Sequence, residues 1–160
     1  MNTQENTHNN SRNLTFQSPL VMLVDDSEIT NYVNSKLMKR YEFSDRILIY
    51  EDPTLAFAYL ENASVNGNEI PAIIFLDLNM PQMDGRTFVE KFEQLPELVQ
   101  ANCKIIILSS SSDPKDKSNL MARKSVHAYF SPPLIKSNFV ELVSILKKFR
   151  PVNRNEELVA

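Results

Sequence analysis

Two stretches of the chain read LVMLVDD, residues 20–26, and AIIFLD, residues 72–77. Continuous apolar runs of this length are typical of strands in a parallel sheet that is buried on both faces. Each run ends in carboxylates, since Asp25 and Asp26 follow the first run and Asp77 follows the second. A side chain at the C-terminal end of such a strand lies where open α/β sheets bind their ligands.

These three carboxylates predict a cation site. If the two strands are neighbours, roughly 4.8 Å apart, the carboxylates crowd one small space. Their mutual repulsion makes that arrangement costly without a cation, a shared proton or solvent. Hard oxygen ligands at a sheet edge favour Mg²⁺, which binds few carboxylates, keeps its waters and accompanies phosphate. One such aspartate alone is usually a helix cap or a turn residue, so the prediction depends on all three.

Composition excludes several classes of protein. The chain has 160 residues, which fits one domain, and a net charge of −3 without the basic stretch of a nucleic-acid-binding protein. Cys103 is the single cysteine, so no intramolecular disulfide framework is expected. The polar N-terminus has no signal-peptide core, and the apolar runs are too short to span a membrane. We therefore expect a soluble cytoplasmic protein that binds neither nucleic acid nor membrane.

The chain divides into a polar tail at 1–18, a body at 19–150 and a short tail at 151–160. Within the body, strand and helix patterns alternate, and right-handed crossovers then favour a doubly wound (βα)5 sheet. Strands are expected near residues 20–24, 46–50, 72–76, 104–108 and 127–130. Helices are expected after Ser27, Asp52-Pro53, Gly85 and Asp113-Pro114, and from about Ser137 to Arg150. The first helix has Ile29, Val33 and Leu37 on one face, and Pro96 ends or interrupts the third.

Three motifs at the expected strand ends resemble the receiver domain of two-component response regulators. They are Val24-Asp25-Asp26-Ser27, the run FLDLNMPQMDG at 75–85, and Ile107-Leu108-Ser109-Ser110. The resemblance covers about residues 19–150 and implies a flavodoxin-like α/β fold with a five-stranded parallel sheet of order 2-1-3-4-5. Because the tails leave no room for an output domain, a stand-alone signalling domain is expected rather than an enzyme.

The resemblance implies a role for each matching residue. Asp77 would accept a phosphoryl group from a phosphohistidine on a histidine kinase or a phosphotransfer protein, and the domain would promote its own phosphorylation and dephosphorylation. Ser109 would hydrogen-bond the phosphoryl group after transfer. Tyr129 would be the switch aromatic, and a downstream protein target would then be contacted.

The resemblance also implies how Mg²⁺ would be held. Asp26 would bind the ion directly and Asp25 mainly through water. Asp77 and the backbone carbonyl of Asn79 would complete the protein's part of the metal site. Phosphoryl transfer depends mostly on positioning and electrostatics, so the ion would neutralise charge on the transferring group. Gly85, which ends the loop after Asp77, is expected to take a positive φ.

One departure from the family bears on function. Receiver domains end their fifth strand with Lys-Pro, whereas this chain reads Ser131-Pro132-Pro133. Pro133 matches the family proline, so Pro132 replaces the lysine and offers neither a charge nor an N–H. By the same resemblance, the Pro132–Pro133 bond is expected to be cis.

Two classes of function stay open from the residues. The first is a phosphorylatable receiver, and the second is a pseudo-receiver that serves as an interaction module with impaired switching because of Pro132. An aspartyl-phosphate phosphatase of another α/β family fits poorly, because such enzymes place Asp-x-Asp on the first strand. A flavodoxin fits equally poorly, because Asp25-Asp26 replaces the expected hydroxyl-rich phosphate loop.

Overall fold

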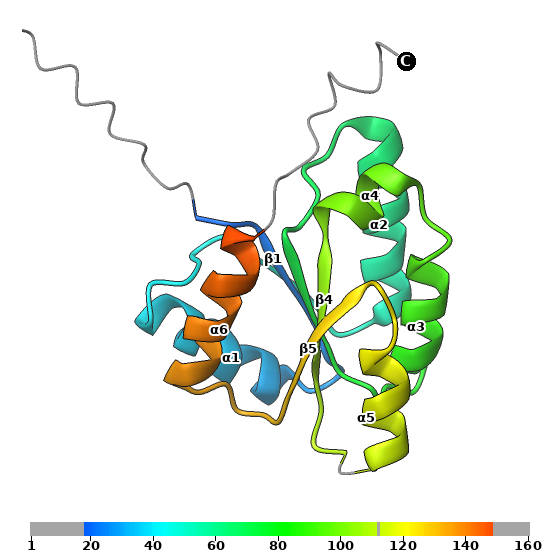
Figure 1. Cartoon of the computed structure of the whole chain (residues 1–160). Helices are drawn as coiled ribbons and strands as arrows, with labels where there is room; N and C mark the ends of the chain where they lie inside the picture. Colours follow the sequence, from blue (N-terminus) through cyan, green and yellow to red (C-terminus); the bar gives the residue numbers. More distant parts are fainter. Residues whose placement is uncertain (1–17, 112, 149–160) are drawn as a thin grey trace, which may run out of the picture.

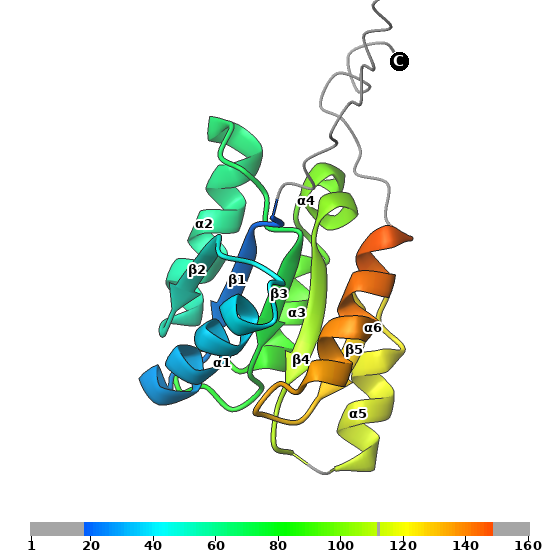
Figure 2. The same cartoon turned by 90° about the vertical axis from the view of Figure 1, so that its left-hand side faces the viewer.

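The computed structural model describes residues 18–111 and 113–148 as one parallel sheet between two layers of helices (Figures 1 and 2). The strand order β2-β1-β3-β4-β5 confirms the predicted topology. The strands are β1 (Val21–Val24), β2 (Ile47–Tyr50), β3 (Ile73–Leu76), β4 (Lys104–Leu108) and β5 (Val126–Phe130). The tails predicted at 1–18 and 151–160 lie outside the described residues, apart from Ser18.

The helices cover both faces of the sheet. Helices α1 (Glu28–Arg40) and α6 (Lys136–Lys147) lie on one face (Figure 1). The other face carries α2 (Pro53–Asn66), α3 (Gly85–Phe92), α4 (Glu97–Asn102) and α5 (Pro114–Met121). The side chains of Ser27, Asp52 and Asp113 each cap a helix start as the sequence predicts. In the described part of the chain no helix is both long and apolar enough to cross a bilayer.

Helix α4 was not predicted. The sequence pattern indicated one helix after Gly85 that Pro96 ends or interrupts, but α3 already ends at Phe92 and a second, short helix follows Pro96. The carbonyl of Pro96 accepts the N–H groups of Val99 and Gln100, which starts α4. A proline at this position loses no hydrogen bond, because the first N–H groups of a helix have no partner within it.

The buried face of α1 also differs from its apolar stripe. Ile29 is 77% exposed and Val33 is 38% exposed, whereas Asn31, Asn34 and Met38 are buried. Two asparagines therefore occupy the interior side of this helix. Their partners lie at the functional end of the sheet and are described below.

The core consists of two apolar clusters, one on each face of the sheet. Strands β1, β3 and β4 are buried along their whole length, as their continuous apolar sequences predict. Strand β2 lies at the edge, and its Ile49 is 46% exposed. The burial of β1 and β3 on both faces leaves their C-terminal ends as the places where polar side chains reach solvent.

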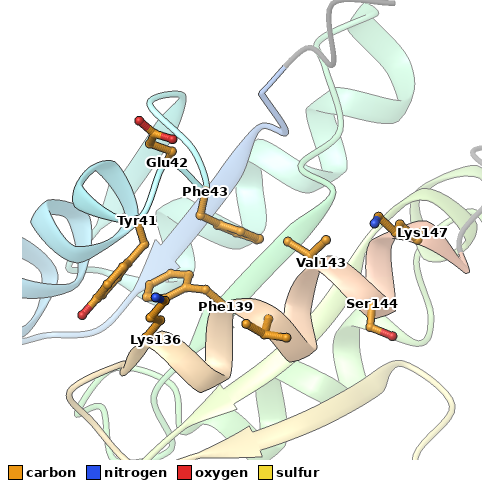
Figure 3. Close-up of a pocket in the computed structure, with 9 residues that line it drawn as sticks. Tyr41, Glu42, Phe43, Lys136, Phe139, Val143, Ser144 and Lys147 are labelled. Atoms are coloured by element: carbon orange, nitrogen blue, oxygen red, sulfur yellow. The ribbon is translucent and has the colours of Figure 1, made fainter.

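A groove of about 480 Å³ lies between the turn after α1 and helix α6 (Figure 3). Phe139 of α6 packs against Tyr41 and Phe43, with ring centroids 5.2 and 5.5 Å apart. Lys136 also lines this groove. The aromatic contacts fix the C-terminal end of α1 against α6. The other end of α1 begins at Glu28, and only its N-cap Ser27 separates it from Asp26.

Candidate functional site

Strands β1 and β3 are neighbours, and their register sets the site. Val24 pairs with Leu76, so the residues that follow both strands emerge at the same edge of the sheet. Asp25, Asp26 and Asp77 each offer a carboxylate oxygen, and these three oxygens lie within 4.8 Å of one another. Asp25 and Asp77 are partly buried and Asp26 is exposed. The predicted convergence of the three carboxylates is confirmed.

Three hydrogen bonds hold Asp25. Its N–H donates to the carbonyl of Tyr50 at 3.2 Å, which continues the pairing of β1 with β2. Its Oδ1 accepts from the N–H of Ser27 at 2.8 Å, and its carbonyl accepts from Nδ2 of Asn31 at 2.7 Å. The start of α1 is therefore tied to the turn that carries two carboxylates.

Asp77 is held from the other side of the site. Its N–H donates to the carbonyl of Val24 at 2.9 Å, and its Oδ2 accepts from the N–H of Asn79 at 3.0 Å. Ser109 follows β4 and is fully buried beside Asp77. Burial raises the pKa of the Asp77 carboxyl, and the nearby Ser109 hydroxyl opposes this with a smaller effect. The structure thus brings Asp77, Asn79 and Ser109 together at the end of β3.

Gly85 is required by a close approach rather than by a positive φ. The predicted positive φ is wrong, since Gly85 lies outside the left-handed region. A Cβ on Gly85 would lie 2.4 Å from the carbonyl oxygen of Asp77 and 2.9 Å from Cα of Leu78. The N–H of Gly85 also donates to the carbonyl of Leu78 at 3.0 Å. The start of α3 therefore packs directly onto the backbone of Asp77.

The electrostatics of the site reflect its crowded negative charge. Burial, and to a smaller extent the charges of Asp77 and Asp26, raises the pKa of Asp25 from 3.8 to about 6, against the lowering effect of the Ser27 N–H. Burial also raises the pKa of Asp77, and the charge of Asp26 adds to this effect. A site that resists its own ionisation and offers hard oxygen donors fits a small divalent cation such as Mg²⁺.

Tyr129 lies on β5, one strand away from Ser109. Its hydroxyl donates to the carbonyl of Ser111 at 3.0 Å, and Nζ of Lys117 lies 5.5 Å from the centre of its ring. The N–H of Ser111 in turn donates to Oγ of Ser109 at 3.2 Å. Ser111 thus connects Tyr129 to Ser109, a link that the sequence motifs alone do not predict because it runs through backbone atoms.

The loop between β5 and α6 contains the departure from the family. The Pro132–Pro133 bond is cis, as predicted. Lys136 is the first lysine after Pro132, and it lines the groove beside Phe139 (Figure 3). The N–H of Leu134 donates to Oδ1 of Asn34 at 3.3 Å, so this loop is also held by α1.

Comparison with known proteins identifies the family. A family model described as the response regulator receiver domain matches residues 21–144, so the chain belongs to that family. The response regulator Rcp1 of Synechocystis sp. is 28% identical over 98 residues, which cover 61% of this chain and 65% of Rcp1. The chain therefore matches slightly less than two thirds of that relative.

Solved structures agree with the family assignment. A two-component response regulator from Cytophaga hutchinsonii superimposes with a TM-score of 0.76 and 26% identity, over 82% of this chain and 98% of that one. A response regulator receiver protein from Dyadobacter fermentans gives a TM-score of 0.67 and 27% identity, over 78% and 94%. Receiver domains serve two-component signalling, bind Mg²⁺ at an acidic site and interact with histidine kinases or phosphotransfer proteins, and acceptance of a phosphoryl group is typical of them.

Proposed function

We propose that residues 19–150 form a receiver that accepts a phosphoryl group on Asp77 from a histidine kinase or a phosphotransfer protein and passes the signal on by protein contact. The observation that carries this proposal is the convergence of three carboxylate oxygens within 4.8 Å at the ends of β1 and β3. Among these aspartates Asp77 is the one that lies beside the buried Ser109, at the end of the neighbouring strand β4.

Each residue has a step in the transfer. A carboxylate oxygen of Asp77 attacks the phosphorus of a phosphohistidine, the new O–P bond forms as the N–P bond breaks, and the imidazole nitrogen keeps the electron pair and takes a proton. A bound Mg²⁺ supplies positive charge against the phosphoryl oxygens. Asp25, Asp26, Asp77 and the carbonyl of Asn79 would hold the ion. Rcp1, a relative of the same fold, has been solved in a Mn²⁺-bound form, which supports the proposal of a divalent cation.

The proposal includes a route from Asp77 to Tyr129. The Ser109 hydroxyl would donate to a phosphoryl oxygen once Asp77 is modified. Because the Ser111 N–H bonds Ser109 and the Ser111 carbonyl bonds Tyr129, a displacement of Ser109 would also shift the contact of Tyr129. This supports a role for Tyr129 as the switch aromatic.

The second candidate is a pseudo-receiver, which Pro132 favours. The side chain at this position carries no charge, and Lys136 lines the groove on α6. In this alternative the cation would still bind, but phosphorylation would be absent or would leave the conformation of Tyr129 unchanged.

The test is incubation with acetyl phosphate and Mg²⁺, followed by intact mass measurement. The parent protein should gain the mass of one phosphoryl group, and Asp77→Asn should gain none. Asp84→Asn is the matched control, because Asp84 lies in the same loop but caps α3, and asparagine caps a helix about as well as aspartate. A mass gain on Asp77→Asn would contradict the assignment, and a parent that binds Mg²⁺ but gains no mass would favour the pseudo-receiver.

A further inference from the structure

Helix α1 turns two amide side chains inward. Asn31 is 2% exposed and Asn34 is 1% exposed, and their spacing of three residues places them on the same face of the helix. Buried amides normally have all of their polar atoms in hydrogen bonds. The two asparagines differ in how far they meet this rule.

Asn31 meets it only in part. Its Nδ2 donates to the carbonyl of Asp25 at 2.7 Å, but its buried Oδ1 has no hydrogen-bond partner among the described residues. An apolar side chain of similar size would avoid the unpaired oxygen. Departures of this kind from local rules collect at functional sites. We therefore infer that an amide is present at this position because of the hydrogen bond that its Nδ2 donates.

The bond from Asn31 acts on the peptide unit that joins the two aspartates. The carbonyl of Asp25 and the N–H of Asp26 belong to one planar group, so fixing the carbonyl fixes the plane from which both side chains project. The other two bonds of Asp25 involve its N–H and its Oδ1, and neither acts on this peptide plane. Asn31 is the side chain that does so.

We propose that Asn31 is a positioning residue for the cation site, which orients the peptide between Asp25 and Asp26 so that both carboxylates face Asp77. This inference rests on the proposed function, because that function supplies the cation. Under this proposal, helix α1 also contributes to cation binding, although Asn31 lies outside the motifs at the strand ends.

The experiment compares Asn31→Leu with Asn34→Leu. Both variants replace a buried amide on the same face of α1, but the amide of Asn34 accepts from Leu134 and does not contact Asp25. Mg²⁺ affinity is measured by titration of backbone amide NMR signals. Asn31→Leu should bind Mg²⁺ roughly tenfold more weakly, as is typical when a partner that orients metal ligands is lost. Asn34→Leu should keep the affinity of the parent. Unchanged affinity in Asn31→Leu, or an equal loss in both variants, would overturn the proposal.

A second readout does not need the cation. In cation-free protein, the Ser27 amide that donates to Asp25 should exchange its hydrogen faster in Asn31→Leu than in the parent or in Asn34→Leu. If Asn31→Leu does not fold, Asn31→Asp keeps the side-chain shape without the N–H donor and serves in the same measurement. A parent that fails to bind Mg²⁺ would refute the proposed cation site. Exchange at Ser27 would still decide the inference, since equal rates in all proteins would overturn it and faster exchange in the Asn31 variants alone would support it.

Discussion

The loops after β1 and β3 have the charged residues that a receiver site needs, whereas the loop after β5 lacks one of them. The first two loops bring Asp25, Asp26 and Asp77 to one point and fix them with backbone hydrogen bonds. The loop after β5 reaches the same end of the sheet but has Pro132 where receiver domains have a lysine. The first two loops thus bring together the carboxylates of the proposed acceptor and cation site, while the loop after β5 has no lysine at the position where the family has one.

Under the proposed function, this difference separates the residues that would accept a phosphoryl group from those that would respond to it. Acceptance would depend on the three carboxylates, which lie in the loops after β1 and β3, and on the cation that they would hold. The response would depend on Ser109, Ser111 and Tyr129, whose hydrogen bonds connect the site to β5. Changes in the first pair of loops should therefore have larger effects than changes in the last one.

The largest effect is expected from Gly85→Ala, which disturbs the backbone of Asp77 directly. The added Cβ would meet two backbone atoms at 2.4 and 2.9 Å, and backbone cannot yield as a flexible side chain does. The free energy of unfolding, measured by urea denaturation, should fall by about 3 kcal/mol or more.

Gly67→Ala is the control for Gly85→Ala. Gly67 follows α2 with a φ of 77° and is exposed, so alanine there should cost only about 1 kcal/mol through its left-handed backbone. Equal losses in the two variants would contradict the argument from close approach.

Asp26→Asn is expected to weaken Mg²⁺ binding about a hundredfold. Loss of an orienting partner typically costs ten- to a hundredfold in affinity, and loss of a direct ligand should reach the upper end of that range. Titration of the parent and the variant gives the two dissociation constants, with Asp84→Asn as a control in the same region of charge. Equal affinity in Asp26→Asn and the parent would refute the assignment of Asp26 as a ligand.

Much of this site could be predicted from the sequence. Apolar runs that end in aspartates indicated both the buried strands and the convergence of Asp25, Asp26 and Asp77, because strand ends at one edge of a parallel sheet must lie close together. The reason for Gly85 was not predictable, since it depends on the distance between α3 and the Asp77 backbone. The position of Asn31 was not predictable either, because it also depends on a contact between a helix and a strand end. The exposed Ile29 and Val33 suggested the wrong inner face of α1, and the amide is buried because it bonds a carbonyl outside the helix.

Asp25→Asn should change how stability depends on pH in cation-free protein. The pKa of Asp25 is raised from 3.8 to about 6, so the folded state holds this proton more tightly than the unfolded chain does. Its contribution to stability is fully present below pH 3.8 and is lost as pH rises to about 6. The free energy of unfolding of the parent should therefore fall across this window, by on the order of 2 kcal/mol from this group once its partial exposure to solvent is allowed for.

Urea denaturation between pH 4 and pH 7 measures this slope, which Asp25→Asn should flatten. Saturating Mg²⁺ should restore the stability of the parent above pH 6, because the ion binds the ionised carboxylates. A slope that is the same in the parent and the variant would show that Asp25 is not the group that titrates.

The smallest effect, about tenfold, is expected from Pro132→Lys, and it bears most directly on the difference between the loops. A charge-assisted hydrogen bond contributes roughly 1.5–3 kcal/mol, and each 1.4 kcal/mol changes an equilibrium constant tenfold. Restoring a lysine beside the phosphoryl group should therefore shift the switching equilibrium without being needed for phosphorylation of Asp77. NMR signals of the Tyr129 ring, with and without acetyl phosphate, report the switch, because the Tyr129 hydroxyl bonds Ser111. Ser131→Lys adds the same charge at the exposed neighbouring position and should have little effect. If this prediction is right, the parent should not already show the complete change at Tyr129. A complete change in the parent, with no increase in Pro132→Lys, would show that switching does not need the lysine and would contradict the proposed difference between the loops.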